Sequence, residues 1–555
     1  MIKSISIKFF FLLFFFELVK CAKIIHPEGG PKDEKSALLI NSSIKNGQTT
    51  VDIKTKSIVF EFDKPIKIDD ISNIFINANT EFDIVIFDKK LILKFKKDLK
   101  EDTQYYINFD KTIKDTTESN ISENISINFS TSKNIDENEI RGTVYDQKTI
   151  LKEKSIMVCL FEIKEEDPEK NSKIHLSNRP NYFTYTNEKG EFYFSFIKKG
   201  KYKIVAFDAF DCYSKIDYAK NKYGFGYEYI NFDSNNKKIE LNIGINFSDI
   251  RPLEIVSKKK IGKNFEVKFN KSIASFEEVS FDTRYKIYKR EDDTLNIFYL
   301  RGNKNDRGDE IKFSKKIKVR DIYGCENVFE VDTILNSNDK NNLEDKFFLS
   351  EKKEFIGKKG TIEIKSNKPI DREKINLYMM NFKINEKDIF VKEEDFIFDE
   401  KNNSFKIKYD FSSIDLEDES KIEFTIKSQT FSFLDQSYNK ISNFIFIFDK
   451  YKSSSIQGFI YTDSKNFTIE CVDREGNVID KILKNKNDSH DYLFQGLKEG
   501  KYIIRILIHQ RFTENWFAGN IEKNLKADPI YFCSKVIDIP SSFESKQNDI
   551  YCNEL

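Results

Sequence analysis

The sequence is poor in the residues that mark fibrous and low-complexity chains. Its 555 residues include only 9 prolines and 20 glycines, which excludes collagen-like and mucin-like proteins. Tryptophan occurs once, and histidine occurs four times, at positions that do not have metal-binding or catalytic spacing: His26, His175, His490 and His509. We expect each histidine to be structural or exposed to solvent.

An excess of charge of either sign is also lacking. The chain carries 91 basic and 91 acidic residues, and its formal net charge is +0. Proteins that bind nucleic acids normally carry a basic excess that complements the phosphate backbone. We therefore expect no nucleic-acid partner, and lysine runs such as 258–260 are expected to be solvated.

Motifs that carry catalysis or bind cofactors are missing. The sequence has no glycine-rich phosphate loop, no nucleophile elbow and no His-Glu-x-x-His motif. Its seven cysteines include no Cys-x-x-Cys pair, so zinc and redox motifs lack support. A Ser-His-Asp triad assembled only in space stays open as an alternative. We expect no enzyme, no cofactor and no metal site, and we expect buried single thiols.

A long apolar run occurs only at the N-terminus. Two lysines precede the run Phe9 to Phe16, and Cys21 follows shortly afterwards. The run is too short for a transmembrane helix and is typical of a secretory signal. This arrangement resembles a bacterial lipoprotein signal, in which the cysteine is lipidated and becomes the first mature residue. Lys20 stands where that family has a small residue, so a signal cleaved beside a chance cysteine is the alternative.

The residues after Cys21 strengthen the resemblance. Residues 27–33 read Pro-Glu-Gly-Gly-Pro-Lys-Asp, and this composition is unsuited to a helix or a central strand. Cys21 followed by this segment resembles the start of Bacteroidetes lipoproteins that carry Ig-like domains. The resemblance implies a lipid attached to Cys21, a short tether and then β-sandwiches, with the anchor in the outer membrane.

From about residue 36 the hydrophobic pattern alternates with the period of a β-strand. Ile58, Phe60 and Phe62 alternate with more polar neighbours. Residues 84–95 read as a hairpin with a polar turn, and further strands are expected at 105–109 and 125–129. Short strands at close intervals, with few helical stretches, favour sandwiches.

A first internal repeat marks three of these sandwiches. An alternating strand runs into Asp63-Lys64-Pro65-Ile66, then into Asn270-Lys271-Ser272-Ile273, and again into Asn367-Lys368-Pro369-Ile370. An Asx residue caps such a turn, and Pro fixes its own φ. Ile113-Lys114-Asp115 and Val319-Arg320-Asp321 follow strands late in the first two copies. These copies resemble the bacterial Ig-like domain of S-layer and surface proteins, and Phe60, Val267 and Ile364 should all face inward.

A second repeat alternates with the first. Residues 140–146 and 456–463 open its two copies, and residues 193–204 align with 492–504. In each copy a strand reaches a glycine turn, at Gly200 or Gly500, and the next strand starts at Tyr202 or Tyr502. The pattern predicts hairpins and resembles the non-catalytic transthyretin-like sandwich of carboxypeptidase regulatory domains. The two glycines are expected to have φ above zero.

Two loops carry residues that could form a site. Asp208, Asp211, Asp217 and Asn221 could offer oxygen ligands to Ca²⁺, although a solvated loop is the better interpretation of a segment interrupted by apolar residues. The loop around Trp516 is the equivalent in the last copy. It resembles the pattern of the lipoprotein family at Asn515-Trp516 and Gly519-Asn520, but Phe517 stands where the resemblance implies an acid. Trp516 is expected to be a packed anchor of the loop rather than a platform for a sugar.

Together these patterns predict an all-β chain of tandem β-sandwich modules, Ig-like and transthyretin-like, behind an N-terminal lipoprotein signal. The predicted segments are a signal peptide at 1–20, a lipidated tether at 21–35, Ig-like sandwiches at 36–135, 250–340 and 345–450, and carboxypeptidase-regulatory-like sandwiches at 139–248 and 455–555.

The predicted function is that of a non-catalytic scaffold of the cell envelope, anchored to a membrane through Cys21. An envelope binding module for a protein or a glycan is the alternative, and it predicts an exposed groove or aromatic patch on one sandwich. A hydrolase with an unrecognised site is a third reading, and it requires a cleft with converging acids or histidines.

Overall fold

The computed structural model describes residues 32–78, 80–163, 179–209, 211, 214–226, 229–233, 237–262, 264–279, 284–300, 310–336, 343–351, 353–452, 454–512, 515–533 and 535–552. Within these residues the chain is all-β, as predicted, and its helical elements are three short 3-10 turns: η1 (Ile71–Asn73), η2 (Leu377–Met379) and η3 (Glu393–Asp395). No helix of the described part combines the length and apolar character needed to cross a membrane. The predicted signal, Cys21, His26 and His175 lie outside the described residues.

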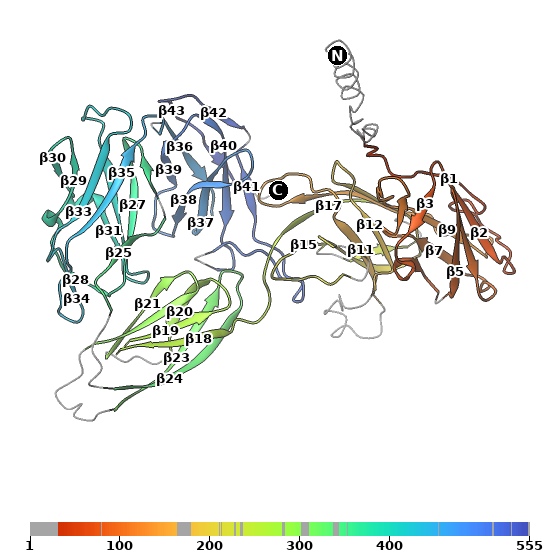
Figure 1. The fold of residues 1–555 in the computed structure, drawn as a ribbon, viewed down its shortest axis with the longest axis horizontal. Coiled ribbons are helices and arrows are strands. Elements are labelled where there is room, and N and C mark those ends of the chain that lie inside the picture. The colour runs from red at the N-terminus through yellow and green to blue at the C-terminus, as the bar shows by residue number, and fades with distance from the viewer. Residues whose placement is uncertain are drawn as a thin grey trace, which may run out of the picture. The chain divides into compact units, whose positions relative to one another are not determined.

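The strands gather into five successive groups, which we call modules 1 to 5, and in the described part no strand of one module pairs with a strand of another (Figure 1). The chain also divides into two compact units, one reaching to Asp136 and the other holding most of the chain from Glu137 onward. Module 1 therefore belongs to the first unit, and modules 2 to 5 belong to the second.

Module 1 is a sandwich built around an alternating strand. In β2 every second residue is buried, and Ile58, Phe60 and Phe62 are fully inaccessible. The Phe60 ring meets Phe109 edge-on, with centroids 4.9 Å apart. The sheets have the orders β1-β2-β6-β5, β4-β7-β9 and β3-β8. The strands are β1 (Leu39–Ser42), β2 (Ser57–Phe62), β3 (Ile66–Ile68), β4 (Phe75–Ile76), β5 (Phe82–Phe87), β6 (Lys90–Phe95), β7 (Gln104–Asn108), β8 (Ile113–Asp115) and β9 (Ser126–Ser130).

Module 2 is one eight-stranded sheet of order β12-β11-β14-β15-β17-β10-β13, with β16 paired to β14. Its first and last strands, β10 and β17, run parallel and side by side over eight registered residue pairs. The strands are β10 (Asn138–Asp146), β11 (Met157–Glu162), β12 (Tyr182–Tyr185), β13 (Glu191–Ile197), β14 (Gly200–Phe207), β15 (Lys222–Phe225), β16 (Ile230–Phe232) and β17 (Lys238–Phe247).

Module 3 is a sandwich of two sheets, β18-β19-β22-β21 and β20-β23-β24. Inward side chains of both sheets, among them Val267, Leu295 and Val331, form one hydrophobic core. The strands are β18 (Ile255–Ile261), β19 (Asn264–Phe269), β20 (Ile273–Glu278), β21 (Tyr285–Glu291), β22 (Thr294–Tyr299), β23 (Glu310–Asp321) and β24 (Glu326–Asn336).

Module 4 is a third sandwich, with sheets of order β25-β27-β32-β31 and β26-β35-β33-β29-β30 and the pair β28-β34. Its core is rich in phenylalanine, and the Phe382 and Phe424 rings have centroids 4.7 Å apart. The strands are β25 (Phe347–Leu349), β26 (Phe355–Ile356), β27 (Lys359–Ser366), β28 (Ile370–Ile375), β29 (Met380–Ile384), β30 (Lys387–Phe390), β31 (Phe396–Asp399), β32 (Ser404–Asp410), β33 (Lys421–Ile426), β34 (Phe431–Phe433) and β35 (Ser442–Phe448).

Module 5 repeats the strand pairings of module 2 except the pairing of β15 with β17, so its described strands form two sheets instead of one. One sheet has the order β39-β36-β43 with β44 also on β36, and the other has the order β38-β37-β40-β41 with β42 on β40. The strands are β36 (Ser454–Tyr461), β37 (Phe467–Val472), β38 (Val478–Lys484), β39 (Asp491–Leu497), β40 (Gly500–Ile508), β41 (Ile530–Phe532), β42 (Ile537–Ile539), β43 (Glu544–Ser545) and β44 (Ile550–Tyr551).

The structure confirms the equivalences predicted from both repeats. Phe60, Val267 and Ile364 are 0%, 1% and 0% exposed. Tyr202 pairs with Ile230 at the start of β14, and Tyr502 pairs with Ile537 at the start of β40. Both tyrosine hydroxyls donate to a backbone carbonyl four residues earlier, at 2.9 Å. The preceding glycines have φ of 153° and 159°, above zero as expected.

Candidate functional site

The lysines of the first repeat occupy one recurring place in modules 1, 3 and 4. Lys64, Lys271 and Lys368 each stand just after the strand that carries the buried position of the repeat. Lys271 and Lys368 form ion pairs with Asp321, the last residue of a later strand, and with Asp435, which follows a later strand. Lys64 forms its ion pair with Asp33 of the entering chain and is attracted more weakly to Asp115, which also ends a later strand. The pairs arise because the segment after each lysine pairs with the strand that leads to the aspartate, as Ile66 does with Asp115 and Ile273 with Asp321.

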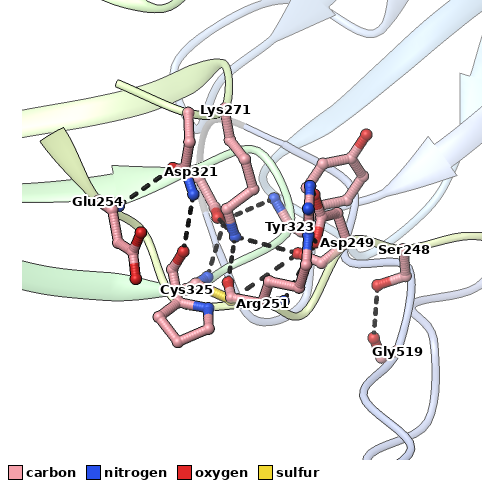
Figure 2. Close-up of polar contacts among 11 residues, drawn as sticks. Ser248, Asp249, Arg251, Glu254, Lys271, Asp321, Tyr323, Cys325 and Gly519 are labelled. Carbon is pink, nitrogen blue, oxygen red and sulfur yellow. Dashed lines mark hydrogen bonds and ion pairs between the residues drawn. The ribbon is translucent and has the colours of Figure 1, made fainter. Parts of the chain in front are cut away.

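The pair in module 3 is the most completely buried of the three (Figure 2). The side chains of Lys271 and Asp321 are 3% and 0% exposed and form an ion pair. The Lys271 ammonium also donates to the carbonyl oxygens of Asp249 at 3.1 Å and Arg251 at 2.5 Å. Asp321 accepts the backbone N–H groups of Tyr323 and Cys325 through its other oxygen. A charge buried in this way is tolerated because it is paired and hydrogen-bonded.

The residue before the lysine holds the same stretch of chain. Asn270 accepts the N–H of Glu254 at 3.0 Å and donates its side-chain amide to the carbonyl of Pro252 at 3.0 Å. Its own backbone N–H donates to the carbonyl of Glu254. Asn270 and Lys271 together therefore fix residues 249–254, which form the linker between module 2 and module 3.

Module 1 has the same arrangement at its entrance. Lys64 donates to the carbonyl of Lys35 at 2.6 Å and to the Asp33 carboxylate at 2.5 Å. The backbone N–H of Asp63 donates to the carbonyl of Leu38, and the N–H of Leu38 donates to the Asp63 carboxylate at 2.7 Å. The end of the predicted tether is thus bound to the sandwich that follows it.

Module 4 keeps part of the arrangement. The N–H of Asn367 donates to the carbonyl of Lys346, a residue that precedes the first strand of this module. Lys368 lies 3.4 Å from the Asp435 carboxylate and donates to the Ser437 hydroxyl at 3.2 Å. Lys368 thus connects its own turn to the segment 435–437 of the same module. Of Asn367 and Lys368, it is the backbone of Asn367 that binds the entering chain.

The pKa values of Asp321 in module 3 and Asp115 in module 1 are shifted in opposite directions. Burial raises the pKa of Asp321 above its usual value, and this effect outweighs the opposing influence of Lys271 and of the two backbone N–H groups. Burial also acts to raise the pKa of Asp115, but hydrogen bonds from the backbone of Glu118, Ser119 and Asn120 outweigh it, and the pKa is lowered. Asp321 is therefore the carboxylate that burial makes costly to ionise.

The end of β17 and Ser248, directly before this linker, contact a loop of module 5. Ser248 donates its hydroxyl to the carbonyl of Gly519 at 3.0 Å (Figure 2), and Asn246 donates to the carbonyl of Ala518 at 3.1 Å. On the side of module 3, the Phe247 ring meets Tyr323 edge-on, with centroids 5.6 Å apart. Modules 2, 3 and 5 thus meet at residues 246–249.

A second contact joins module 2 to module 5. Arg505 is 2% exposed and donates to the Glu470 carboxylate at 2.6 Å and to the carbonyl of Lys148 at 2.5 Å. The Lys148 ammonium lies 5.2 Å from the centroid of the Trp516 ring. Burial lowers the pKa of Lys148. The loop after β10 therefore rests on the β37–β40 face.

Trp516 is a packed anchor of its loop, as predicted. It is 8% exposed, contacts Leu507 and Ala527, and donates its indole N–H to the carbonyl of Asp528 at 2.7 Å. The Asp528 carboxylate accepts the backbone N–H groups of Gln510, Arg511 and Phe517. Asp528 is thus the acid that organises this loop, although the sequence directed attention to position 517.

Residues of the 208–221 loop and the described histidines make local contacts. Asp217 accepts the N–H of Ala219 at 3.0 Å, and Asn221 accepts the N–H of Asp217 at 2.8 Å, so both close one turn. His490 contacts the carbonyl of Ile460, and His509 contacts the Thr468 hydroxyl. Within the described ranges no group of three or more His, Cys, Asp or Glu side chains could hold a metal ion.

The sequence contained both halves of each lysine–aspartate pair but did not indicate that they meet. Lys64 and Lys271 were recognised as part of a turn, and Asp115 and Asp321 were recognised as the end of a later strand. A signal was present, because both halves recur together in modules 1 and 3. Asp435 could not be recognised in this way, because it does not end a tripeptide similar to Ile113-Lys114-Asp115.

Comparison with known proteins agrees with this fold. Residues 33–131 match the bacterial Ig-like domain. No curated protein matches the chain. The match covers module 1 and the end of the predicted tether, so it supports an Ig-like domain in this part of the chain.

Solved structures of surface proteins are similar at very low identity. The TIE protein of Bacillus anthracis is 9% identical, with 95% of this chain and 76% of that chain covered and a TM-score of 0.13. The major pilin subunit BcpA of Bacillus cereus is 9% identical, with 76% and 100% covered and a TM-score of 0.14. The surface layer protein SbsC, domains 1–6, is 10% identical, with 91% and 68% covered and a TM-score of 0.15. At these TM-scores the similarity carries no argument about function.

Proposed function

We propose that this protein is a non-catalytic scaffold of the cell envelope, a string of five β-modules held to the outer membrane by a lipid on Cys21. The modules are proposed as domains at 36–135, 139–248, 250–340, 345–450 and 455–555. The observation that carries the proposal is the binding of the entering chain in modules 1 and 3. A scaffold needs its modules held in fixed register, and linkers bound by buried groups supply that property.

The described chemistry supports a structural role. The Lys271 ammonium is occupied by three acceptors, and the Asp321 carboxylate is occupied by the ammonium and two backbone N–H groups. Both side chains are shielded from solvent. The pair therefore serves to fix the linker in place and not to donate or accept a proton in a reaction.

Hydrogen exchange on the intact chain tests the scaffold. Arg251 and Glu254 donate their backbone N–H groups to Asp249 and Asn270, so their amides should exchange about as slowly as those of β19. Amides at 249–254 that exchange at the rate of an unstructured peptide would show a free linker and contradict the scaffold. A fixed linker allows opening only through larger, rarer fluctuations.

Lipidation is tested separately. Labelled palmitate should enter the mature protein and be lost in Cys21→Ala, because the cysteine thiol is the proposed point of attachment. The matched control is Cys552→Ala, in which the label should be retained. A soluble mature form of the unmodified sequence, or label retained in Cys21→Ala, would contradict the anchor and leave the scaffold to be judged by exchange.

The alternative function, a binding module, is favoured by one specific observation. It predicts an exposed groove or aromatic patch on one sandwich, and module 5 has such a groove at the end of β36.

A further inference from the structure

The groove at the end of β36 combines exposed aromatic rings with free polar groups. It has a volume of about 610 Å³ and is lined, among others, by Phe459, Tyr461, Asp463, His490 and Gln510. All of its lining residues come from module 5. Its size falls within the range of small-molecule sites in proteins, which is roughly 300 to 1,000 Å³.

The strand period places the aromatic rings on the outer face of the sheet. Ile460 points into the core and is 0% exposed, whereas its neighbours Phe459 and Tyr461 are 39% and 43% exposed. The parallel strand β44 places Tyr551 beside Tyr461. Their rings are stacked, with centroids 4.4 Å apart and 4° between the planes. Tyr551 is 62% exposed, and its ring covers one face of Tyr461 and holds that ring in position.

Fixed and free polar groups surround these rings. His490 contacts the carbonyl of Ile460 at 3.2 Å and packs edge-on against Phe467, so its ring is held in place. No described residue hydrogen-bonds to or forms an ion pair with the Asp463 carboxylate or the Gln510 carboxamide. A carboxylate and a carboxamide are planar groups that accept and donate hydrogen bonds in the directions that hydroxyl groups require.

Charge decides which class of ligand fits. Among the described residues that line the groove there is no lysine or arginine, and Asp463 is the one carboxylate. A phosphate or a carboxylate ligand would meet repulsion and no counter-charge. A purely apolar ligand would leave the carboxylate and the carboxamide without partners. A pyranose satisfies both conditions, because its C–H face packs on an aromatic ring and its hydroxyl groups bind to planar polar side chains.

We infer that this groove is a binding site for a neutral glycan built of hexopyranose units. Phe459 and Tyr461 form the stacking surface, Tyr551 supports it by stacking on Tyr461, and Asp463 and Gln510 bind the hydroxyl groups. The inference rests on module 5 alone and does not depend on the lipid anchor or on the fixed linkers. A glycan site would give an envelope scaffold a point of contact with surrounding polysaccharide.

Binding is tested by calorimetry and saturation-transfer NMR on the whole mature chain. The probes are maltotriose, cellotriose, mannotriose and triacetylchitotriose, with trigalacturonate as the anionic control. At least one neutral trisaccharide should bind, and trigalacturonate should not. No binding by any of the four neutral probes, or equal binding of trigalacturonate, would overturn the inference.

Variants then locate the site. Tyr461→Ala should weaken binding of the selected trisaccharide about tenfold, since loss of a stacking ring costs on the order of 1 to 3 kcal/mol for flat ligands. Asp463→Asn should weaken it less, and the exposed Tyr378→Ala in module 4 should leave it unchanged. Both substituted groove positions are largely solvent-exposed, so the variants should fold, and circular dichroism checks this. Affinity unchanged in Tyr461→Ala and Tyr551→Ala would place the glycan elsewhere and overturn the assignment.

Discussion

Lys271 occupies a position where a single charged group binds two parts of the chain. Its ammonium touches a carboxylate of its own module and two carbonyl oxygens of the preceding linker. Each of these contacts is shielded from water, so breaking the pair costs more free energy than breaking an exposed ion pair. Removing either partner would leave a buried charge without compensation.

Lys271→Met should therefore lower the free energy of unfolding at pH 7 by about 3 to 5 kcal/mol, the usual cost of breaking a buried pair. Urea unfolding of the whole chain measures the change. The control is Lys316→Met, a substitution of an exposed lysine on β23 of module 3. A loss below about 1 kcal/mol, which is typical of exposed pairs, would show that the ammonium is solvated.

Part of that loss should be recovered in acid. The pKa of Asp321 is raised by burial, so the folded state binds a proton more readily than the unfolded state. The contribution of Asp321 to stability therefore rises as the pH falls through its raised pKa. Without Lys271 the raised pKa moves further upward, so the deficit of Lys271→Met should shrink between neutral and mildly acidic pH. A loss of stability in Lys271→Met that grows in acid would contradict this prediction.

Asp115 should respond to acid in the opposite direction. Its pKa is lowered by backbone hydrogen bonds that outweigh burial, so its contribution is present at neutral pH and is lost as the pH falls through the lowered pKa. The protection of amides in β7 and β9, measured relative to their intrinsic exchange rates, should fall in acid and should lose this dependence in Asp115→Asn. The exposed Asp83→Asn should keep the dependence of the unmodified chain. If Asp115→Asn retains it too, another carboxylate controls the acid response of module 1.

At the level of the strand, Gly142 and Gly458 explain why the second repeat opens with Ile-x-Gly. A β-carbon at Gly142 would lie 1.7 Å from the carbonyl oxygen of Leu241, and one at Gly458 would lie 2.3 Å from that of Asn548. In both modules a parallel segment lies against the opening strand at this point. The glycine therefore permits the close approach of two backbones.

Gly142→Ala and Gly458→Ala should each destabilise the chain by about 1 to 3 kcal/mol, because overpacking forces backbone to move. Thermal unfolding followed by circular dichroism measures the effect. Arg141→Ala, an exposed change on the same strand, should leave the transition nearly unchanged. Equal transitions for Gly142→Ala and Arg141→Ala would mean that the parallel segment shifts without cost.

The strands were predictable because their signal is local. Alternation in residues 58–62 set the inward face of β2, and the position of Phe60 relative to the Asx-Lys turn carried over to Val267 and Ile364. Tyr202 and Tyr502 were placed correctly for the same reason. Lys271 and Asp321 were not joined, because an ion pair between distant strands depends on which strands become neighbours, and alternation does not encode that choice. The groove at Tyr461 was missed because its lining comes from segments far apart in the sequence, among them Asp463, His490 and Gln510.

At the scale of the larger unit, the tryptophan offers a reporter of module contacts. Trp516 is the only tryptophan of the sequence, and it lies where module 5 meets Lys148 of module 2. A cation held over an indole and shielded from water contributes up to about 2 kcal/mol. The fluorescence of Trp516 therefore reports whether the contact between modules 2 and 5 is formed.

Lys148→Ala should shift the emission of Trp516 to longer wavelength and increase its quenching by acrylamide, because the ring loses its cover. Far-ultraviolet circular dichroism should stay unchanged, since the loop lies outside the strands. Lys154→Ala, an exposed lysine of the same module, is the control. Emission identical to that of the unmodified protein would show that other groups keep the indole covered.

The parallel pairing of β10 with β17 has a consequence for a chain under tension. These are the first and last strands of module 2, and eight residue pairs, from Glu139 with Lys238 to Asp146 with Ile245, hold them together. A pull on the two ends of this module acts along both strands in opposite directions, so the whole ladder is loaded in shear and its bonds must break together. In module 4 the parallel contact of β26 with β35 has only two pairs. Stretched from both ends, module 4 should therefore yield at lower force, and module 2 should be among the last parts of the chain to give way.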